Sequence, residues 1–271
     1  MSRIVRFHKI GGPEVLCVDE VSDIYPGPNE VRINVKAIGL NRAEVMLREG
    51  IYHEKPKFPS RLGYEAAGVI DLVGDDVSCW KVGDIVSTIP SFSLSQTNQG
   101  VYGESAIVPA EVLSKYPSCL TPIQGAAIWM QYLTAYGALV SYGNLKSGQT
   151  VIVTAASSSV GIAAIQLVTL LGAEVIAVTR NNIKKPPLYK LGAQHVIVTE
   201  EEDLIDEVKK ITNGRGADLA FDPIAGPALN LICNSMANHG KIFEYGALYP
   251  GNTNYPLMPM LARSLSIIGY Q

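Results

Sequence analysis

Hydrophobic and polar residues follow one another in regular blocks along the second half of the chain. A short β-branched run at 151–153 leads through small residues into an apolar run at 162–168 with helical spacing, a pattern that predicts a buried strand, a tight turn and a helix. Similar blocks follow, and they predict strands at 174–180, 195–199, 218–222 and 241–245 and helices at 186–191, 203–212 and 226–236. Strands that alternate with helices indicate an α/β fold with a parallel, doubly wound sheet.

The first half of the chain has a different pattern. Strand-like runs separated by Gly, Pro, Asn and Asp clusters predict a β-rich domain, with strands at 4–8, 30–37, 68–73, 84–89 and 106–108. One short helix, 42–49, interrupts them, with Asn41 suited to cap its start and Gly50 to end it. The composition changes to Ala-rich helix near Ile123, so we expect one domain over 1–124 and a second over 125–271.

The last apolar run, 265–270, predicts one more buried strand. A buried strand seldom ends a natural chain, so we expect a further C-terminal segment in the natural protein. An exposed apolar strand is also an aggregation hazard. We therefore expect this strand to lie inside the sheet or to extend it across a homodimer.

The turn after the strand at 151–153 resembles a dinucleotide-binding turn in a weakened form. Where three glycines are usual, this chain has Ala155, Ser158 and Gly161. Ala and Ser are small enough for backbone N–H groups and a helix N-terminus to face a pyrophosphate, and serine hydroxyls add donors. On this stretch alone, a small-residue turn that binds nothing remains an alternative.

Composition narrows the class of protein. The 271 residues are 47% hydrophobic and 17% charged, with a net charge of -3 and a pI near 5.8, so nucleic acid and anionic membranes are not the expected partners. The four cysteines form no CxxC pair, which favours reduced thiols. Because the N-terminus has no apolar signal segment and the helix after 161 is too short to span a bilayer, we expect a cytoplasmic protein.

Three separated motifs carry a family resemblance. They are the segment 39–52, which contains Gly39, Asn41, Gly50 and Tyr52; the segment 63–68, Gly-Tyr-Glu-Ala-Ala-Gly; and the segment 132–139. In this order they resemble the medium-chain dehydrogenase/reductase superfamily, in its zinc-independent, zeta-crystallin-like quinone oxidoreductase branch. The resemblance covers essentially the whole chain and implies a GroES-like catalytic domain followed by a Rossmann domain. The family's C-terminal return to the catalytic domain is not found in this sequence.

The resemblance also bears on metal chemistry. Zinc alcohol dehydrogenases of the superfamily bind their catalytic metal through Cys, His and Cys, and the matching positions here are Asn41, Tyr64 and Met130. None of these side chains can replace a thiolate or an imidazole as a zinc ligand. The segment 91–100, which matches the lobe of the four structural cysteines, contains no Cys. We therefore expect no metal site.

Without a metal, a nicotinamide enzyme suits substrates that are already electrophilic at carbon, such as quinones and α,β-unsaturated carbonyls. The resemblance places Asn41 and Tyr52 in the substrate pocket, where Asn41 could donate its amide to the carbonyl oxygen and Tyr52 could donate a hydrogen bond or a proton. Tyr64 is a further candidate donor. The alternatives are a helix cap for Asn41, a surface aromatic for Tyr52 and a plain core tyrosine for Tyr64.

The second strand of the α/β domain ends at Arg180-Asn181-Asn182, with Lys184 and Lys185 close behind and no carboxylate. A carboxylate at this point would bind the ribose hydroxyls of NAD, whereas cations pair with the 2′-phosphate of NADPH. We expect NADPH, with Arg180 and Lys184 at the phosphate; a solvated basic turn is the alternative. The other cofactor contacts implied by the resemblance are Met130, Thr134, Ala156, Ser157, Ser158, Ser159, Val160, Gly246 and Ala247.

Two classes of function remain open. The first is NADPH-dependent transfer of hydride to a small quinone or enone, without metal, by a homodimer. The second is a catalytically weak NADPH-binding sensor, structural protein or RNA-binding protein on the same scaffold, or an alcohol or aldehyde reductase. Cofactor binding without turnover would select the sensor or structural role.

Overall fold

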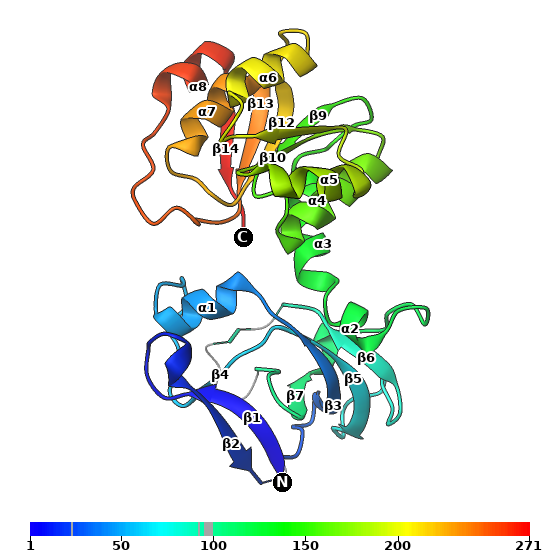
Figure 1. Ribbon diagram of the computed structural model, residues 1–271. Helices are drawn as coiled ribbons and strands as arrows, with labels where there is room; N and C mark the ends of the chain where they lie inside the picture. The colour runs from blue at the N-terminus through cyan, green and yellow to red at the C-terminus, as the bar shows by residue number, and fades with distance from the viewer. Residues whose placement is uncertain (23, 92, 95–99) are drawn as a thin grey trace. The chain divides into compact units, whose positions relative to one another are not determined.

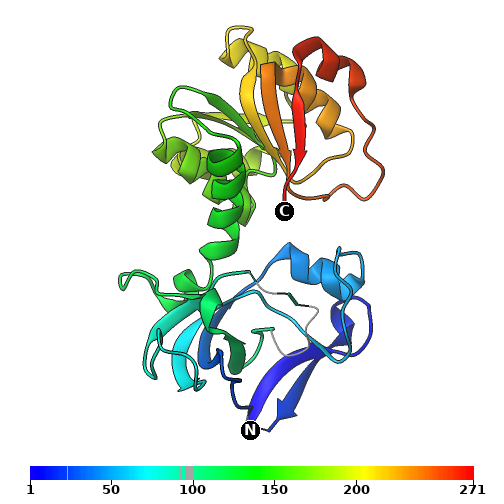
Figure 2. The ribbon, with the colours of Figure 1, turned by 180° about the vertical axis from the view of Figure 1, so that it is seen from behind.

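The computed structural model describes residues 1–22, 24–91, 93–94 and 100–271, which form two compact units, Met1–Met130 and Gln131–Gln271 (Figures 1 and 2). The change in composition predicts an earlier boundary, at 124/125. Helix α2 (Pro122–Gly125) contacts strands β3 and β5 of the first unit. The first unit therefore extends through α2 to the first turn of α3 (Trp129–Tyr136).

The first unit is β-rich, as the alternating pattern predicts. A five-stranded antiparallel sheet has the order β7-β3-β5-β6-β8, and a three-stranded sheet has the order β2-β1-β4. The bounds are β1 Ser2–Phe7, β2 Leu16–Val21, β3 Glu30–Gly39, β4 Ser60–Arg61, β5 Glu65–Val73, β6 Ile85–Thr88, β7 Ser105–Pro109 and β8 Leu113–Ser114. The sequence pattern does not predict β2, because this edge strand is largely exposed and lacks an alternating apolar face.

Helix α1 (Arg42–Glu49) has the predicted bounds, because both of its ends are encoded locally. Asn41 has the extended backbone of an N-cap, and Gly50 ends the helix in the left-handed region at φ 74°. The buried face consists of Glu44, Leu47 and Arg48. A buried glutamate and arginine on one helix face indicate that α1 supplies polar contacts as well as packing.

The second unit has a six-stranded parallel sheet of order β11-β10-β9-β12-β13-β14, which is the doubly wound order predicted from the sequence. The strands are β9 Thr150–Val153, β10 Glu174–Thr179, β11 His195–Val198, β12 Ala217–Asp222, β13 Met236–Glu244 and β14 Ser266–Gly269. The helices are α4 Ser159–Leu170, α5 Lys185–Lys190, α6 Leu204–Ile211, α7 Ala228–Ser235 and α8 Leu257–Arg263. The chain order reverses between β9 and β12, and ligands of such sheets bind at this crevice.

Both faces of this sheet are buried. Val151 and Val153 pack with the helix pair α4 and α5, whereas Ile152 between them packs with α6 and α7. Figure 1 shows these helices on opposite faces of the sheet. The two buried faces explain why the strands are nearly continuous apolar runs.

Strand β14 differs from the expectation of a buried strand. It pairs only with β13 among the described residues, so it forms one edge of the sheet. Ile267 and Ile268 are half-buried, while Ser266 and Gly269 are exposed. Burial was predicted wrongly because an apolar run does not tell an edge strand from a central one; pairing across a homodimer stays a prediction.

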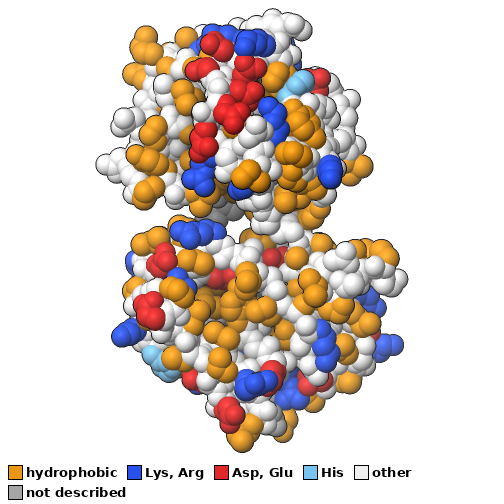
Figure 3. Space-filling model, viewed as in Figure 1, with side chains coloured by type: hydrophobic (Ala, Val, Ile, Leu, Met, Phe, Trp, Pro, Cys, Tyr) orange, Lys and Arg blue, Asp and Glu red, His pale blue; other side chains and the backbone are white. Residues whose placement is uncertain are grey.

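Acidic and basic side chains are interspersed on the face of each unit shown in Figure 3, in keeping with the small net charge of -3. Among the described residues, no helix is both long enough and apolar enough to cross a bilayer.

Candidate functional site

The turn between β9 and α4 is tight. Ala155 adopts a positive φ of 45°, where a glycine is more usual. A Cβ at Gly161 would lie 2.7 Å from the backbone oxygens of both Ala155 and Ala156, so only glycine permits this approach. Ser158 caps α4 and accepts a hydrogen bond from the Gly161 N–H at 3.1 Å. The N-terminus of a twelve-residue helix is thereby presented at the carboxyl end of β9.

The predicted cofactor residues of this turn differ in their exposure. Ser157, Ser158 and Val160 are half-buried and Ser159 is exposed, whereas Ala156 is fully buried. The Ala156 N–H donates to the Val178 oxygen of β10 at 3.2 Å. Ala156 therefore contributes to the packing of the turn, and the three serines supply its accessible polar groups.

The basic segment after β10 is open to solvent. Arg180 and Lys184 are exposed, and neither forms an ion pair within the described part of the chain. Lys185 pairs with Glu202 at 3.4 Å, and Asn182 contacts Glu201. Both carboxylates belong to the segment after β11, so these contacts cannot be inferred from neighbouring positions in the sequence. Asn181 has a buried side-chain oxygen with no hydrogen-bond partner among the described residues.

Gly246 and Ala247 follow β13 at the same edge of the sheet and are exposed. The residues before them carry buried polar atoms without a partner in the described chain: both carboxyl oxygens of Glu244 and the hydroxyl of Tyr245. Burial and the nearby charge of Asp222 raise the pKa of Glu244 to about 9. No motif indicates Asp222 or Glu244, although Asp222 ends the strand predicted at 218–222 and Glu244 lies in the strand predicted at 241–245.

In the first unit, Asn41 joins two buried carboxylates. Its backbone N–H donates to Glu44 Oε2 at 2.7 Å, and its side-chain Nδ2 donates to Glu65 Oε2 at 3.0 Å. Glu44 and Glu65 are 3% and 1% exposed. Burial raises the pKa of both carboxyls, against the effect of the hydrogen bonds they accept. Both residues lie inside motifs that the sequence analysis quoted, but their roles were missed.

The two candidate tyrosines lie together. Tyr64 is 5% exposed, and its backbone N–H donates to Glu44 Oε1 at 2.9 Å. Burial and a hydrogen bond with Tyr52 raise the pKa of Tyr64. Tyr52 is half-buried, packs against the core and contacts the ring of His53 at 4.1 Å. Tyr52 is therefore partly covered by the core, and its role stays a prediction.

Tyr102 is a further neighbour of Glu44. No sequence motif indicates this tyrosine. Its hydroxyl donates to Glu44 Oε2 at 2.6 Å. Asn41, Tyr52 and Tyr64 thus form one polar cluster in the core of the first unit, organised around Glu44. Such a cluster can hold a carbonyl oxygen and supply a proton to it.

Met130 and Thr134 lie on α3. The Met130 N–H donates to Glu65 Oε1 at 2.8 Å, so the same carboxylate holds Met130 and Asn41. Thr134 is half-buried. Their predicted contacts with cofactor stay predictions.

No group of three or more His, Cys, Asp or Glu side chains suited to a metal ion occurs among the described residues. Asn41 and Tyr64, which stand at two of the zinc-ligand positions, are engaged by Glu65 and Tyr52. The predicted cysteine-free segment 91–100 lies partly outside the described residues, at 92 and 95–99.

A GroES-like β-rich unit followed by a doubly wound α/β unit is the architecture of a two-domain dehydrogenase/reductase. The model of the alcohol dehydrogenase GroES-like domain matches residues 27–118, and that of the zinc-binding dehydrogenase matches residues 159–271. The chain is 33% identical to the quinone oxidoreductase of Homo sapiens over 270 residues, which are 99% of this chain and 80% of that protein. It therefore belongs to the medium-chain dehydrogenase/reductase superfamily, among relatives of quinone oxidoreductase, as the sequence motifs predicted.

Solved structures agree with this assignment. The quinone oxidoreductase of Pseudomonas syringae pv. Tomato DC3000 superposes with a TM-score of 0.91 at 30% identity, over 100% of this chain and 82% of that one. The Escherichia coli quinone oxidoreductase complexed with NADPH superposes with a TM-score of 0.88 at 28% identity, over 99% and 81%. The family assignment makes this chain an oxidoreductase of the nicotinamide-dependent class.

Proposed function

We propose that the protein is an NADPH-dependent reductase that transfers hydride to quinones or α,β-unsaturated carbonyls without a metal. The observation that carries this proposal is the cluster of Asn41, Tyr52 and Tyr64, in which amide and phenol groups occupy positions that hold zinc ligands or pocket residues in the superfamily. Such donors stabilise a developing oxyanion by hydrogen bonding. Substrates that are already electrophilic need no stronger activation.

The residues of the second unit fit a dinucleotide phosphate. The N-terminus of α4 and the hydroxyls of Ser157–Ser159 offer donors to a pyrophosphate, and no Cβ at Gly161 obstructs the turn. The exposed cations Arg180 and Lys184 would pair with a 2′-phosphate. When bound, NADPH would supply the hydride.

The residues of the first unit would then handle the substrate oxygen. The Asn41 amide would donate to the carbonyl as negative charge develops on it. Tyr52 would donate its proton to that oxygen, and the hydrogen bond between Tyr52 and Tyr64 would orient the phenol. Met46, half-buried on α1, would form an adaptable apolar pocket wall.

The test is NADPH oxidation with a panel of quinones and enones, run on protein whose zinc content has been measured. The proposal expects metal-free protein to oxidise NADPH with these substrates, at a rate that chelators leave unchanged. Stoichiometric zinc, with activity lost on chelation, would overturn the metal-free mechanism. NADPH binding without turnover of any member of the panel would instead select the sensor or structural role.

A further inference from the structure

Glu65 is a buried carboxylate that forms no ion pair with any cation of the described chain. It is the first residue of β5, and its two oxygens serve different elements. Oε2 accepts from Asn41 Nδ2 at 3.0 Å, and Oε1 accepts from the Met130 N–H at 2.8 Å. A carboxylate this deeply buried is costly unless its hydrogen bonds are made, so both contacts matter to Glu65.

The surroundings leave the Glu65 carboxyl little room to turn. A Cβ at Gly39 would lie 2.8 Å from Glu65 Oε2 and 2.3 Å from the Ala126 oxygen. Only a glycine at that point of β3 leaves space for the carboxyl. The position of Oε2 beside Asn41 is therefore fixed by packing as well as by hydrogen bonding.

An ionised carboxylate only accepts hydrogen bonds, whereas an asparagine amide has one accepting end and one donating end. Glu65 therefore requires the nitrogen end of Asn41 to face it. One Nδ2 hydrogen is used in that contact, and the Glu44 carboxyl also accepts from the Asn41 side chain, so a substrate oxygen would take the place of Glu44 at the second hydrogen. A neutral partner with both a donor and an acceptor would permit the reversed amide.

We propose that Glu65 is the positioning residue of the carbonyl-binding site, which holds Asn41 in the orientation that offers its second Nδ2 hydrogen to the substrate oxygen. This inference rests on the proposed function, because it assigns Asn41 to the substrate. Glu65 acts through Asn41 and does not itself touch the substrate. A role confined to the first turn of α3, through Met130, is the competing explanation.

The experiment is a double-mutant cycle of Glu65→Gln and Asn41→Ala. The Gln side chain has one oxygen, so it cannot accept from both Asn41 and Met130, and its amide group permits Asn41 to reverse. Glu65→Gln is expected to lower kcat about tenfold or more, with little change in the KM for NADPH. The double variant is expected to have the kcat of Asn41→Ala alone, because Glu65 acts through that residue. Independent, multiplying losses would overturn the proposal.

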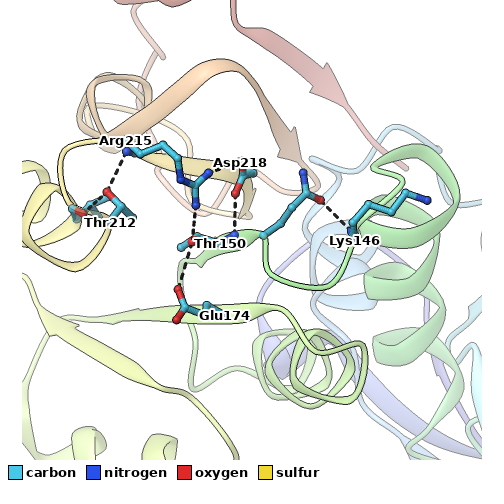
Figure 4. A network of polar contacts seen from close by, with 9 residues as sticks. Lys146, Thr150, Glu174, Thr212, Arg215 and Asp218 are labelled. Atoms are coloured by element: carbon cyan, nitrogen blue, oxygen red, sulfur yellow. Dashed lines mark hydrogen bonds and ion pairs between the residues drawn. The ribbon is translucent and has the colours of Figure 1, made fainter.

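Asp218→Asn is the matched control. Asp218 also accepts from a backbone N–H and from a side chain, Thr150 at 2.8 Å and Arg215 at 2.6 Å, but at the amino end of β12 (Figure 4). Asp218→Asn is expected to lower the stability of the protein and to leave kcat unchanged. If Glu65→Gln does not fold, Glu65→Asp replaces it in the cycle, since the shorter carboxylate cannot hold both partners.

A second measurement separates this inference from the proposed function. If the wild type reduces no carbonyl, the proposed function fails, and the side-chain amide signals of Asn41 are then followed by NMR, identified by their absence in Asn41→Ala. Positioning by Glu65 predicts that Glu65→Gln shifts these signals and speeds the exchange of their protons. Unchanged signals would overturn it.

Discussion

Asp222 and Glu244 are register partners on the adjacent parallel strands β12 and β13, so two carboxyl groups meet at the carboxyl edge of the sheet. Asp222 is fully buried and accepts from the Thr154 hydroxyl and from the Ala225 N–H. Glu244 has no such donors among the described residues. The lack of donors and the neighbouring carboxyl both favour the protonated form of Glu244 and raise its pKa.

The first prediction concerns the pH dependence of stability. The folded protein raises the pKa of Glu244 to about 9, so between the ordinary glutamate pKa of about 4.3 and about 9 it binds a proton that the unfolded chain has lost. Stability should therefore fall as pH rises through this window. Glu244→Gln keeps the neutral shape and should flatten the dependence, with a higher Tm than wild type near pH 8 to 9.

Thermal melting across this pH range is the measurement, with exposed Glu200→Gln as the control. The control should keep the wild-type slope. A Glu244→Gln variant with an unchanged slope would show that this carboxyl is ionised in the folded protein.

The second prediction separates two roles of Asn41. If its amide stabilises the oxyanion, Asn41→Ala should lower kcat by roughly ten- to a thousandfold, with a smaller effect on KM. If it only caps α1 and pairs with buried Glu65, the change should cost about 1–3 kcal/mol of stability and spare kcat. Asp203→Ala, which removes the cap of α6, is the matched control for a pure capping loss. Kinetics and melting of both variants decide between the roles.

The third prediction is cofactor choice. Arg180→Ala removes a charge-assisted contact worth about 1.5–3 kcal/mol. It should lower the affinity for NADPH roughly ten- to a hundredfold and leave the affinity for NADH nearly unchanged. Lys185 is already paired with Glu202, so Lys185→Ala should change NADPH binding less. Fluorescence titration with both cofactors measures this. An equal loss for NADPH and NADH, or a wild type that prefers NADH, would contradict the phosphate assignment.

The fourth prediction tests the turn after β9. Gly161→Ala places a Cβ 2.7 Å from two backbone oxygens, so the turn must open, at a cost of about 1–3 kcal/mol. Tm and NADPH affinity should fall together. Gly269→Ala is the control, because its Cβ would meet nothing within 4 Å. Wild-type cofactor affinity in Gly161→Ala would show that the tight turn is not needed for binding.

Local chemistry determined part of this protein in advance. The bounds of α1 follow from Asn41 and Gly50, and the doubly wound sheet follows from the alternation of apolar strands and helices. Each of these signals involves residues close together in the chain, where propensity, capping and periodicity operate. The family resemblance also predicts Asn41, Tyr52 and Tyr64 as site residues; the structure brings them together, and their roles stay predictions.

Only the tertiary structure decided which groups are partners. Glu65 lies 24 residues from Asn41 in the chain, and the register of β12 against β13 brings Glu244 to Asp222. The position of β14 at an edge likewise depends on which strands pair, not on its own composition. Strand register and burial set these contacts, and a buried carboxyl takes its hydrogen bonds and its pKa from whatever groups the fold places around it. The sequence by itself therefore determined the scaffold and the candidate hydrogen-bond donors. Only the tertiary structure determined which carboxylates accept hydrogen bonds from those donors.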